Sequence, residues 1–172
     1  FYRRDSGAVG NNLDDFIKVA DAASDTGIRT CVTSFLDLYA KVKKRAFAIP
    51  GFSFFDPPLD KKIEVLRRME SRLRERNMRL FACCEREVLE ALPPKSGIKA
   101  ASCVPNHILS ELYGPDLSLR RDSGQRVKKG CGCRVSVDIG NYHLQPCGHN
   151  CLFCYANPLA DVAKKAERRE RP

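Results

Sequence analysis

Cysteine is concentrated near the end of this sequence. Nine of the 172 residues are cysteine, and five of the nine fall within the 24 residues from Cys131 to Cys154. Glycine, proline and asparagine are frequent in this stretch and apolar periodicity is weak, so burial of side chains does not by itself order it. Several thiols close together along a chain are typical of a metal or cluster site, because one ion or cluster needs converging ligands. The segment 131–158 is therefore predicted to bind a metal or a cluster.

Disulfides are the alternative use of so many cysteines. Against them, the cysteine count is odd, the chain is not small, and no signal-peptide pattern precedes the first residue, Phe1. No apolar run approaches the length of a membrane span. We therefore expect thiolate ligation in a cytoplasmic protein with no membrane partner. Because the sequence starts at Phe1 and not at methionine, we also expect a processed chain or a fragment.

Helix-like and strand-like stretches alternate in the first two thirds of the chain. Amphipathic helices are predicted over 11–25 and 56–77, and strands rich in apolar and β-branched residues over 28–39 and 78–84. Residues 97–105 read either as a third strand or as an extended loop. The order helix, strand, helix, strand predicts an α/β fold with parallel strands.

Composition divides the chain into four parts. They are an α/β region 1–114, a polar connector 115–130, a cysteine-rich segment 131–158 and a charged tail 159–172. The first part carries the periodicity that predicts regular structure, and the third carries most of the predicted metal ligands.

Basic residues outnumber acidic ones, which gives a formal net charge of +9. The charge weakly favours an anionic partner. Much of it lies on the predicted helix 56–77, on Lys61, Lys62, Arg67, Arg68, Arg72 and Arg74. A nucleic-acid surface is one interpretation of this helix, and bases could stack on Phe153 or Tyr155. Glu64, Glu70 and Glu75 are interleaved with these cations, which favours an ordinary solvated helix face.

The sequence "CGHNCLFC", from Cys147 to Cys154, has three cysteines in the spacing C-x3-C-x2-C. A cubane [4Fe–4S] cluster normally takes four thiolates. With three from one tight loop, one iron has no protein ligand and can bind a small molecule. Gly148 allows the close approach of the backbone that such a loop needs.

These residues resemble the signature of radical S-adenosylmethionine (SAM) enzymes, in which an aromatic residue, here Phe153, precedes the last cysteine. The resemblance implies a [4Fe–4S] cluster on Cys147, Cys151 and Cys154. It also implies that SAM binds the open iron and is cleaved reductively to a 5′-deoxyadenosyl radical, with Phe153 near the adenine. An electron donor such as ferredoxin or flavodoxin follows from the same chemistry.

A longer resemblance covers the chain from about Tyr2 to Asn157. The ordered set "SFLDLYAK", "CCE", "GIKAASC", "DSGQR", "CGCRVSVDIGNYH" and "CGHNCLFCYAN" resembles an uncharacterised bacterial and archaeal family of unknown function. The hallmark of that family is a radical-SAM-like cysteine cluster at the C-terminus. Family members are longer, so the resemblance implies that this chain is the C-terminal half of a larger TIM-like barrel.

The position of the cysteine loop departs from the usual radical SAM pattern. In most of those enzymes the loop follows the first barrel strand, whereas here little sequence follows Cys154. The strands must therefore precede the loop, and we expect residues 1–114 to form a partial TIM-like barrel. We therefore assign none of the usual SAM-binding strand motifs to residues of this chain.

Four further cysteines match cysteine positions of that family and are predicted to form a second centre. They are Cys83, Cys103, Cys131 and Cys133. Cys83 and Cys103 each end a predicted strand or extended segment, and ligands gather at the carboxyl ends of parallel strands. The four could hold a second [4Fe–4S] cluster or one zinc ion; the alternative for Cys83 and Cys103 is an ordinary buried thiol. Cys31 and Cys84 are predicted to be core thiols.

Several polar residues have both a functional and a structural interpretation. Glu85 follows a predicted strand like a catalytic carboxylate of a barrel, but it could equally cap the next helix. His149, inside the cysteine loop, could bond to cluster sulfur or face solvent. The remaining polar candidates are His107, His143, Asp138, Tyr142, Gln125 and Arg126. Of these, Asp138 and Tyr142 are expected to shape the turn before the loop, and Gln125 and Arg126 to meet an anionic group or lie on the surface.

The sequence thus predicts an iron–sulfur protein, of radical SAM type if it is an enzyme, with an unidentified substrate. The first alternative is a non-catalytic iron–sulfur or zinc protein whose cysteines only hold the chain together. The second is a nucleic-acid-binding or repair protein, whose binding would weaken steeply with salt.

Overall fold

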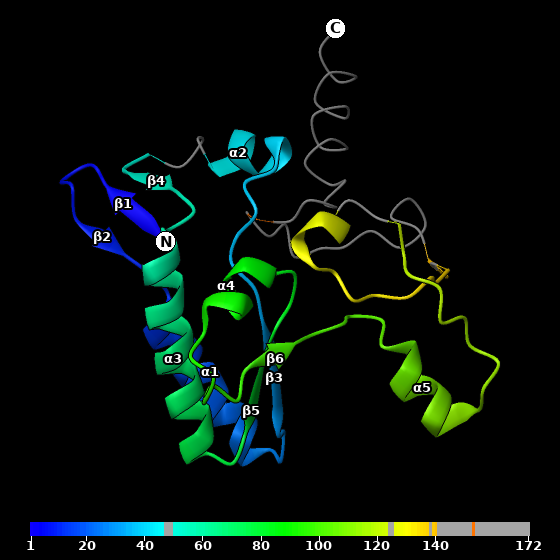
Figure 1. Ribbon diagram of the computed structural model, residues 1–172. Helices are drawn as coiled ribbons and strands as arrows, with labels where there is room; N and C mark the ends of the chain where they lie inside the picture. Colours follow the sequence, from blue (N-terminus) through cyan, green and yellow to red (C-terminus); the bar gives the residue numbers. More distant parts are fainter. Residues whose placement is uncertain (47–49, 124–125, 138, 141–152, 154–172) are drawn as a thin grey trace, which may run out of the picture. The chain divides into compact units, whose positions relative to one another are not determined.

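The computed structural model describes residues 1–46, 50–123, 126–137, 139–140 and 153 (Figure 1). The chain splits into two compact units. One consists of Phe1, Asn11–Phe35 and Asp56–Ser136, and the other of Tyr2–Gly10, Leu36–Phe55 and Val137–Pro172. The predicted boundaries near 114, 130 and 158 stay predictions.

The first unit holds a parallel sheet and most of the helices. Its elements are α1 (Leu13–Asp25), β3 (Thr30–Thr33), α3 (Leu59–Glu75), β5 (Arg79–Ala82), α4 (Arg86–Ala91), β6 (Lys99–Ala100), α5 (Asn106–Tyr113) and the 3-10 turn η1 (Val127–Lys129). The strand order is β3-β5-β6, with both pairings parallel. In the register, Thr33 lies opposite Ala82, and Ala82 lies opposite Ala100. This unit supports the prediction of an α/β organisation with parallel strands.

The second unit holds a small antiparallel sheet. Its elements are β1 (Tyr2–Arg4), β2 (Val9–Gly10), α2 (Ala40–Ala46) and β4 (Phe52–Phe54), and the strand order is β2-β1-β4. β1 pairs with both neighbours in antiparallel register, and Tyr2 lies opposite Phe54. The Tyr2 ring packs edge-on against Phe52, with centroids 5.7 Å apart. Side-chain packing across the strands therefore supports the pairing.

The prediction of a partial TIM-like barrel is wrong. The six strands in the described part of the chain are divided between two three-stranded sheets, one antiparallel and one parallel, and neither closes on itself. A closed parallel barrel needs about eight strands with a consistent tilt and stagger. Here the parallel strands have only two to four residues each.

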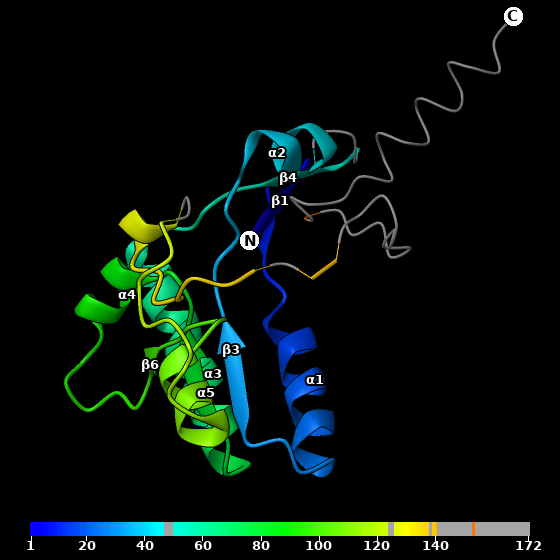
Figure 2. The same ribbon diagram turned by 90° about the vertical axis from the view of Figure 1, so that its right-hand side faces the viewer.

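One face of the parallel sheet is covered by α1 and α3, which contact each other. Figure 1 shows α1 partly behind α3, and Figure 2 shows α3 behind β3 with α1 beside it. Leu66 and Leu73 of α3 are fully buried and pack with Leu80 and Ala82 of β5. α1 contributes buried apolar residues to the same core. The period of about 3.6 residues in α3 and the alternation in β5 place these side chains on facing surfaces.

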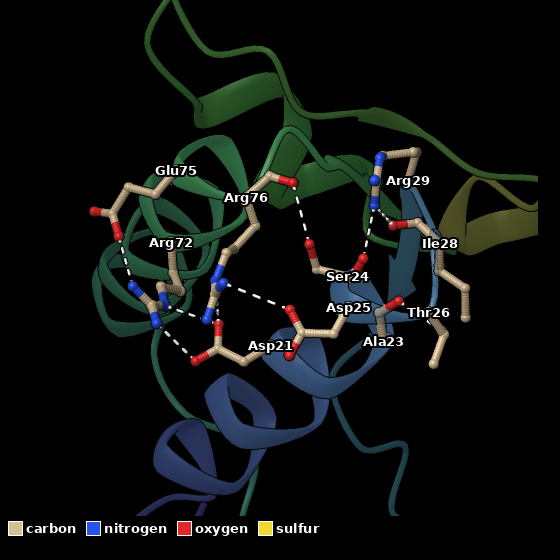
Figure 3. A network of polar contacts seen from close by, with 10 residues as sticks. All are labelled: Asp21, Ala23, Ser24, Asp25, Thr26, Ile28, Arg29, Arg72, Glu75 and Arg76. Atoms are coloured by element: carbon tan, nitrogen blue, oxygen red, sulfur yellow. Dashed lines mark hydrogen bonds and ion pairs between the residues drawn. The ribbon is translucent and has the colours of Figure 1, made fainter.

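A network of charged groups joins α1 to the end of α3 (Figure 3). The Asp21 carboxylate of α1 accepts hydrogen bonds from Arg72, with Nη2 at 2.6 Å from Oδ2, and from Arg76, with Nε at 3.0 Å from Oδ1. Arg72 also pairs with Glu75 at 2.8 Å. Hydrogen bonds from Arg72 and then from Arg76 hold the pKa of Asp21 below its ordinary value of 3.8.

The basic face of α3 is largely matched by acidic side chains. Lys61 pairs with Glu64 at 2.8 Å, and Arg74 pairs with Glu70 at 3.0 Å. Lys62 reaches Asp56 at 2.8 Å. These pairs agree with the interpretation of the helix as a solvated face with alternating charges.

None of the helices among the described residues combines the length and the apolar composition that crossing a bilayer requires.

Replacing Asp21 by asparagine is expected to make folding less dependent on pH in acid. The folded-state pKa of Asp21 lies below the unfolded value, so the carboxylate stabilises the fold above the unfolded pKa and loses this effect as pH falls through the folded pKa. Asp21→Asn should therefore be less stable than the parent at neutral pH, and the difference should shrink below about pH 4. Urea unfolding at a series of pH values measures this.

The matched control is Asp15→Asn on the same helix, where the carboxylate is exposed and lies 4.0 Å from Lys18. This variant should lose much less stability at neutral pH than Asp21→Asn, because exposed ion pairs contribute little. Equal pH profiles for the two variants would contradict a stabilising role of the Asp21 network.

Candidate metal centre

The carboxyl edge of the parallel sheet gathers the residues that follow β5 and β6. β5 runs toward α4 (Figure 1) and is followed by Cys83, Cys84 and Glu85, whereas Cys103 comes three residues after the end of β6. The parallel pairing continues past the strands, because Cys83 N donates to Thr33 O at 2.8 Å and Ala101 N donates to Ala82 O at 2.8 Å. The predicted clustering of thiols at strand ends therefore has a backbone cause.

Three thiols meet at this edge. The Sγ atoms of Cys83 and Cys103 are 3.7 Å apart, and those of Cys83 and Cys84 are 3.5 Å apart. Cys84 has a left-handed backbone with φ 59°, a conformation that residues other than glycine, asparagine and aspartate rarely adopt. This turn at the end of β5 leaves the side chains of two consecutive cysteines beside each other, both nearly fully buried.

The connector after α5 brings two more cysteines to the same place. Asp122 N donates to Cys133 O at 3.1 Å on one side, and Arg134 N donates to Val104 O at 3.2 Å on the other. Cys103 N donates to Cys133 Sγ at 3.2 Å. Cys133 is thus held between the chain before η1 and the chain after β6.

Cys131 is placed by the turn that precedes it. Its backbone N–H donates to Arg126 O at 3.2 Å, and the residue after η1 is Gly130, which has φ 84°. A Cβ atom at Gly130 would lie 2.8 Å from Cβ of Arg86, the first residue of α4. Glycine is therefore required at this position both by the backbone conformation and by the close approach of α4.

Five cysteines gather at this edge, and we call them the thiol ring. Cys83 Sγ lies 3.5 Å from Cys84 Sγ and 3.7 Å from Cys103 Sγ, Cys133 Sγ accepts a hydrogen bond from Cys103 N, and Cys131 packs against Cys83 and Cys84. Phe81 and Ala101 pack against this cluster. Each of the six cysteines in the described part of the chain, the ring and Cys31, is free of a disulfide.

Burial holds most of these thiols in the protonated form. It raises the pKa of Cys83, Cys84 and Cys131, and it raises the pKa of Cys103 to about 11, with a further contribution from the Cys83 thiol. The nearby positive charge of Arg126 opposes this effect by lowering the pKa of Cys83 and Cys84. A metal that binds here must displace protons, so its affinity should rise with pH.

Cys133 differs from the other four. Burial raises its pKa, but hydrogen bonds from Val104 N, from the Cys131 thiol and from Cys103 N together lower the pKa below its ordinary value. Hydrogen bonds donated to sulfur stabilise the thiolate. The hydrogen bonds around Cys133 therefore favour its thiolate form.

The thiol ring is not arranged as a metal site in this structure. Across the described ranges, no group of three or more His, Cys, Asp or Glu side chains is placed so that it could hold a metal ion. A zinc ion needs four ligands, with Zn–S bonds of about 2.3 Å. Proximity of the thiols is thus established, and ligation requires side chains of the ring to move.

The structure brings together the four cysteines predicted for the second centre, and it adds Cys84, which the sequence predicted as a core thiol. The signal for Cys84 is its position directly after a strand-end cysteine, although its left-handed backbone could not be read from the sequence. Cys31 packs against the core formed by α1, α3 and β5.

Glu85 has a structural contact at the same edge. Its Oε1 accepts a hydrogen bond from Phe35 N at 2.8 Å, which ties the end of β3 to the end of β5. Its side chain makes no capping hydrogen bond to α4, although Glu85 is the residue at the N-cap. His107, on α5, is exposed. A catalytic role of Glu85 stays a prediction.

The cysteine loop lies outside the described residues. This applies to Cys147, Cys151 and Cys154 and also to Gln125, Asp138, Tyr142, His143 and His149. Phe153 is described: its ring packs edge-on against Phe54 in the second unit, with centroids 4.9 Å apart and an interplanar angle of 81°.

The fold and the site define an α/β protein with a thiol cluster at the carboxyl edge of its parallel sheet. Residues 5–156 match a protein family described as a domain of unknown function, DUF1848. The chain belongs to this family, as the sequence resemblance to an uncharacterised family predicts. Searches of the curated proteins and of the solved structures found no match.

Replacing Gly130 by alanine is expected to disturb the turn that positions Cys131. A left-handed alanine costs about 1 kcal/mol, and the contact with Cβ of Arg86 adds to this cost. We expect Gly130→Ala to lower the free energy of unfolding by roughly 2 kcal/mol or more and to speed the alkylation of Cys131. Denaturant unfolding and peptide mass spectrometry measure the two effects.

Gly27→Ala is the control, because Gly27 also has a positive φ of 90° but has no heavy atom within 4 Å of an added Cβ. It should lose about 1 kcal/mol and leave Cys131 unchanged. Equal losses and equal alkylation rates in both variants would show that the contact with Arg86 does not position Cys131.

Proposed function

We propose that the chain is an iron–sulfur protein of radical SAM type. Cys147, Cys151 and Cys154 would hold a [4Fe–4S] cluster, and the iron without a protein ligand would bind SAM. The observation that carries the proposal is the C-x3-C-x2-C spacing with an aromatic residue before its last cysteine. Three thiolates from one short loop leave one iron of a cubane open.

The described cysteines are compatible with metal binding, because thiols must be reduced to act as ligands. All six are free thiols, and five of them form the thiol ring. A cluster with an open iron would supply the electron that cleaves SAM to methionine and a 5′-deoxyadenosyl radical, and ferredoxin or flavodoxin would return the electron to the cluster. Phe153, which is partly exposed beside Phe54, is proposed to lie on the adenine side of SAM.

A non-catalytic metal protein is the second candidate function. The thiol ring favours it, since four of its members would saturate a tetrahedral ion and leave no open position. In that case the metal would link distant parts of the chain and would not react with a substrate. The two candidates differ in whether a bound cluster responds to SAM.

The test uses chain purified without oxygen and reconstituted with iron and sulfide. We expect about four irons and four sulfides per chain from the cysteine loop, and an EPR signal of the reduced cluster that changes when SAM is added. Cys151→Ser should lose the cluster. Cys31→Ser, at a partly buried thiol outside both cysteine groups, should keep it.

A cluster whose EPR signal is the same with and without SAM would reject the radical SAM proposal and favour the non-catalytic candidate. Protein that binds no sulfide under these conditions would reject the iron–sulfur proposal itself.

A further inference from the structure

We propose that the thiol ring is a second, separate metal site, which takes one thiophilic ion of tetrahedral preference such as Zn²⁺ through Cys83, Cys103, Cys131 and Cys133. The proposal does not depend on the cluster proposed for the C-terminal loop. It assigns a structural ion to the sheet edge, and it leaves the fifth member of the ring, Cys84, outside the ligand set.

The distances between sulfurs favour a single ion over a cluster. Four sulfurs at about 2.3 Å from one tetrahedral ion lie about 3.8 Å from one another. Within the proposed ligand set, the Sγ atoms of Cys83 and Cys103 are 3.7 Å apart. In a cubane, each thiolate binds a different iron, so its cysteine sulfurs must lie much further apart.

A tetrahedral ion takes four ligands, so one of the five thiols must stay outside the ligand set. We expect this thiol to be Cys84. Cys83 and Cys84 are consecutive, and Cys83 alone of the two contacts Cys103. Cys84 is the one with the strained left-handed backbone. With Cys84 outside the ligand set, the four remaining thiols are available to one ion, and rotation of their side chains would bring the sulfurs to it. Cys131 and Cys133 can bind the same ion because only Gly132 separates them.

The surroundings of the ring suit a bound anionic centre. Four thiolates around one divalent cation carry a net negative charge, and the charge of Arg126 acts on this part of the site. The backbone N–H group of Cys103 donates to Cys133 Sγ at 3.2 Å. Such hydrogen bonds orient a ligand and tune its basicity.

Gly132 lies between the two ligands, beside the chain that follows β6. A Cβ atom at this position would lie 2.5 Å from Ser102 Oγ and 3.7 Å from the Ala101 carbonyl oxygen. An ion bound here would join the ends of β5 and β6 to the segment after η1, which is separated from β5 by about fifty residues. The ion would thereby fix the segment that leads toward the cysteine loop.

The site is tested in a chain in which Cys147, Cys151 and Cys154 are replaced by serine, so that only the ring can bind metal tightly. We expect about one zinc per chain. We also expect Co²⁺ to give the visible ligand-field bands of a tetrahedral thiolate centre. Adding Cys83→Ser, Cys103→Ser or Cys133→Ser should reduce bound zinc at least about tenfold. Cys84→Ser and Cys31→Ser are matched controls that should retain it.

A second measurement covers the case in which this variant does not fold. In the unaltered chain, alkylation followed by peptide mass spectrometry compares each cysteine with zinc present and after chelation. Zinc should slow the alkylation of Cys83, Cys103, Cys131 and Cys133 at least about tenfold, and chelation should restore it.

Three results would overturn the proposal: no bound zinc or cobalt, no effect of zinc on alkylation, or retention of zinc when Cys83, Cys103 and Cys133 are replaced singly. Iron with stoichiometric sulfide at the ring would also overturn it, because the site would then hold a cluster. Loss of the SAM-responsive EPR signal with zinc retained would reject only the function proposed for the loop, so the two failures are distinguishable.

Discussion

The parallel pairing of β5 with β6 is the constraint on which the candidate site depends. Because Ala82 lies opposite Ala100 and the pairing continues through Ala101, the chain leaves both strands at the same edge. The Sγ atoms of Cys83 and Cys103 lie 3.7 Å apart as a direct result of this strand pairing. The same edge receives Cys133, whose sulfur accepts a hydrogen bond from the backbone of Cys103. A different register would separate these sulfurs, since one step along a strand reverses the face of a side chain.

Apolar packing supports one face of the sheet, and a charged network supports one end of it. Leu66 and Leu73 are fully buried between α3 and the sheet. The Asp21 carboxylate clamps the C-terminal end of α3 through Arg72 and Arg76. At the opposite end of the strands, the Glu85 carboxylate binds the backbone of Phe35 and the thiols gather beside it. Stability and the candidate chemistry thus occupy opposite ends of the parallel sheet, as is usual in α/β folds.

Local patterns in the sequence identify the elements with strong periodicity. The helices predicted over 11–25 and 56–77 correspond to α1 and α3, and the strand predicted over 78–84 corresponds to β5. The strand predicted over 28–39 ends early, at Thr33, because the backbone N–H of Phe35 binds Glu85 in place of a neighbouring strand. The sequence contains little sign of the antiparallel sheet, since its pairing of Tyr2 with Phe54 joins residues far apart along the chain.

The candidate metal site, like the fold, could be predicted only in part from the sequence. The rule that ligands gather at the carboxyl ends of parallel strands is sufficient to bring Cys83 and Cys103 together. The approach of Cys131 and Cys133 rests on hydrogen bonds of the polar connector, which has no periodicity to reveal its path. The barrel expectation came from resemblance to longer proteins, and three short parallel strands do not close into one. Cys84 belongs to the thiol ring because its backbone is left-handed, and no sequence pattern predicts this conformation.

The most direct measurement of the central claim is X-ray absorption at the zinc edge of the zinc-loaded chain. If the sheet edge is a tetrathiolate site, the first shell will contain four sulfurs at about 2.3 Å and no nitrogen or oxygen. A first shell dominated by nitrogen or oxygen at about 2.0 Å would contradict the account, because the zinc would then be held by surface residues and not by the thiol ring.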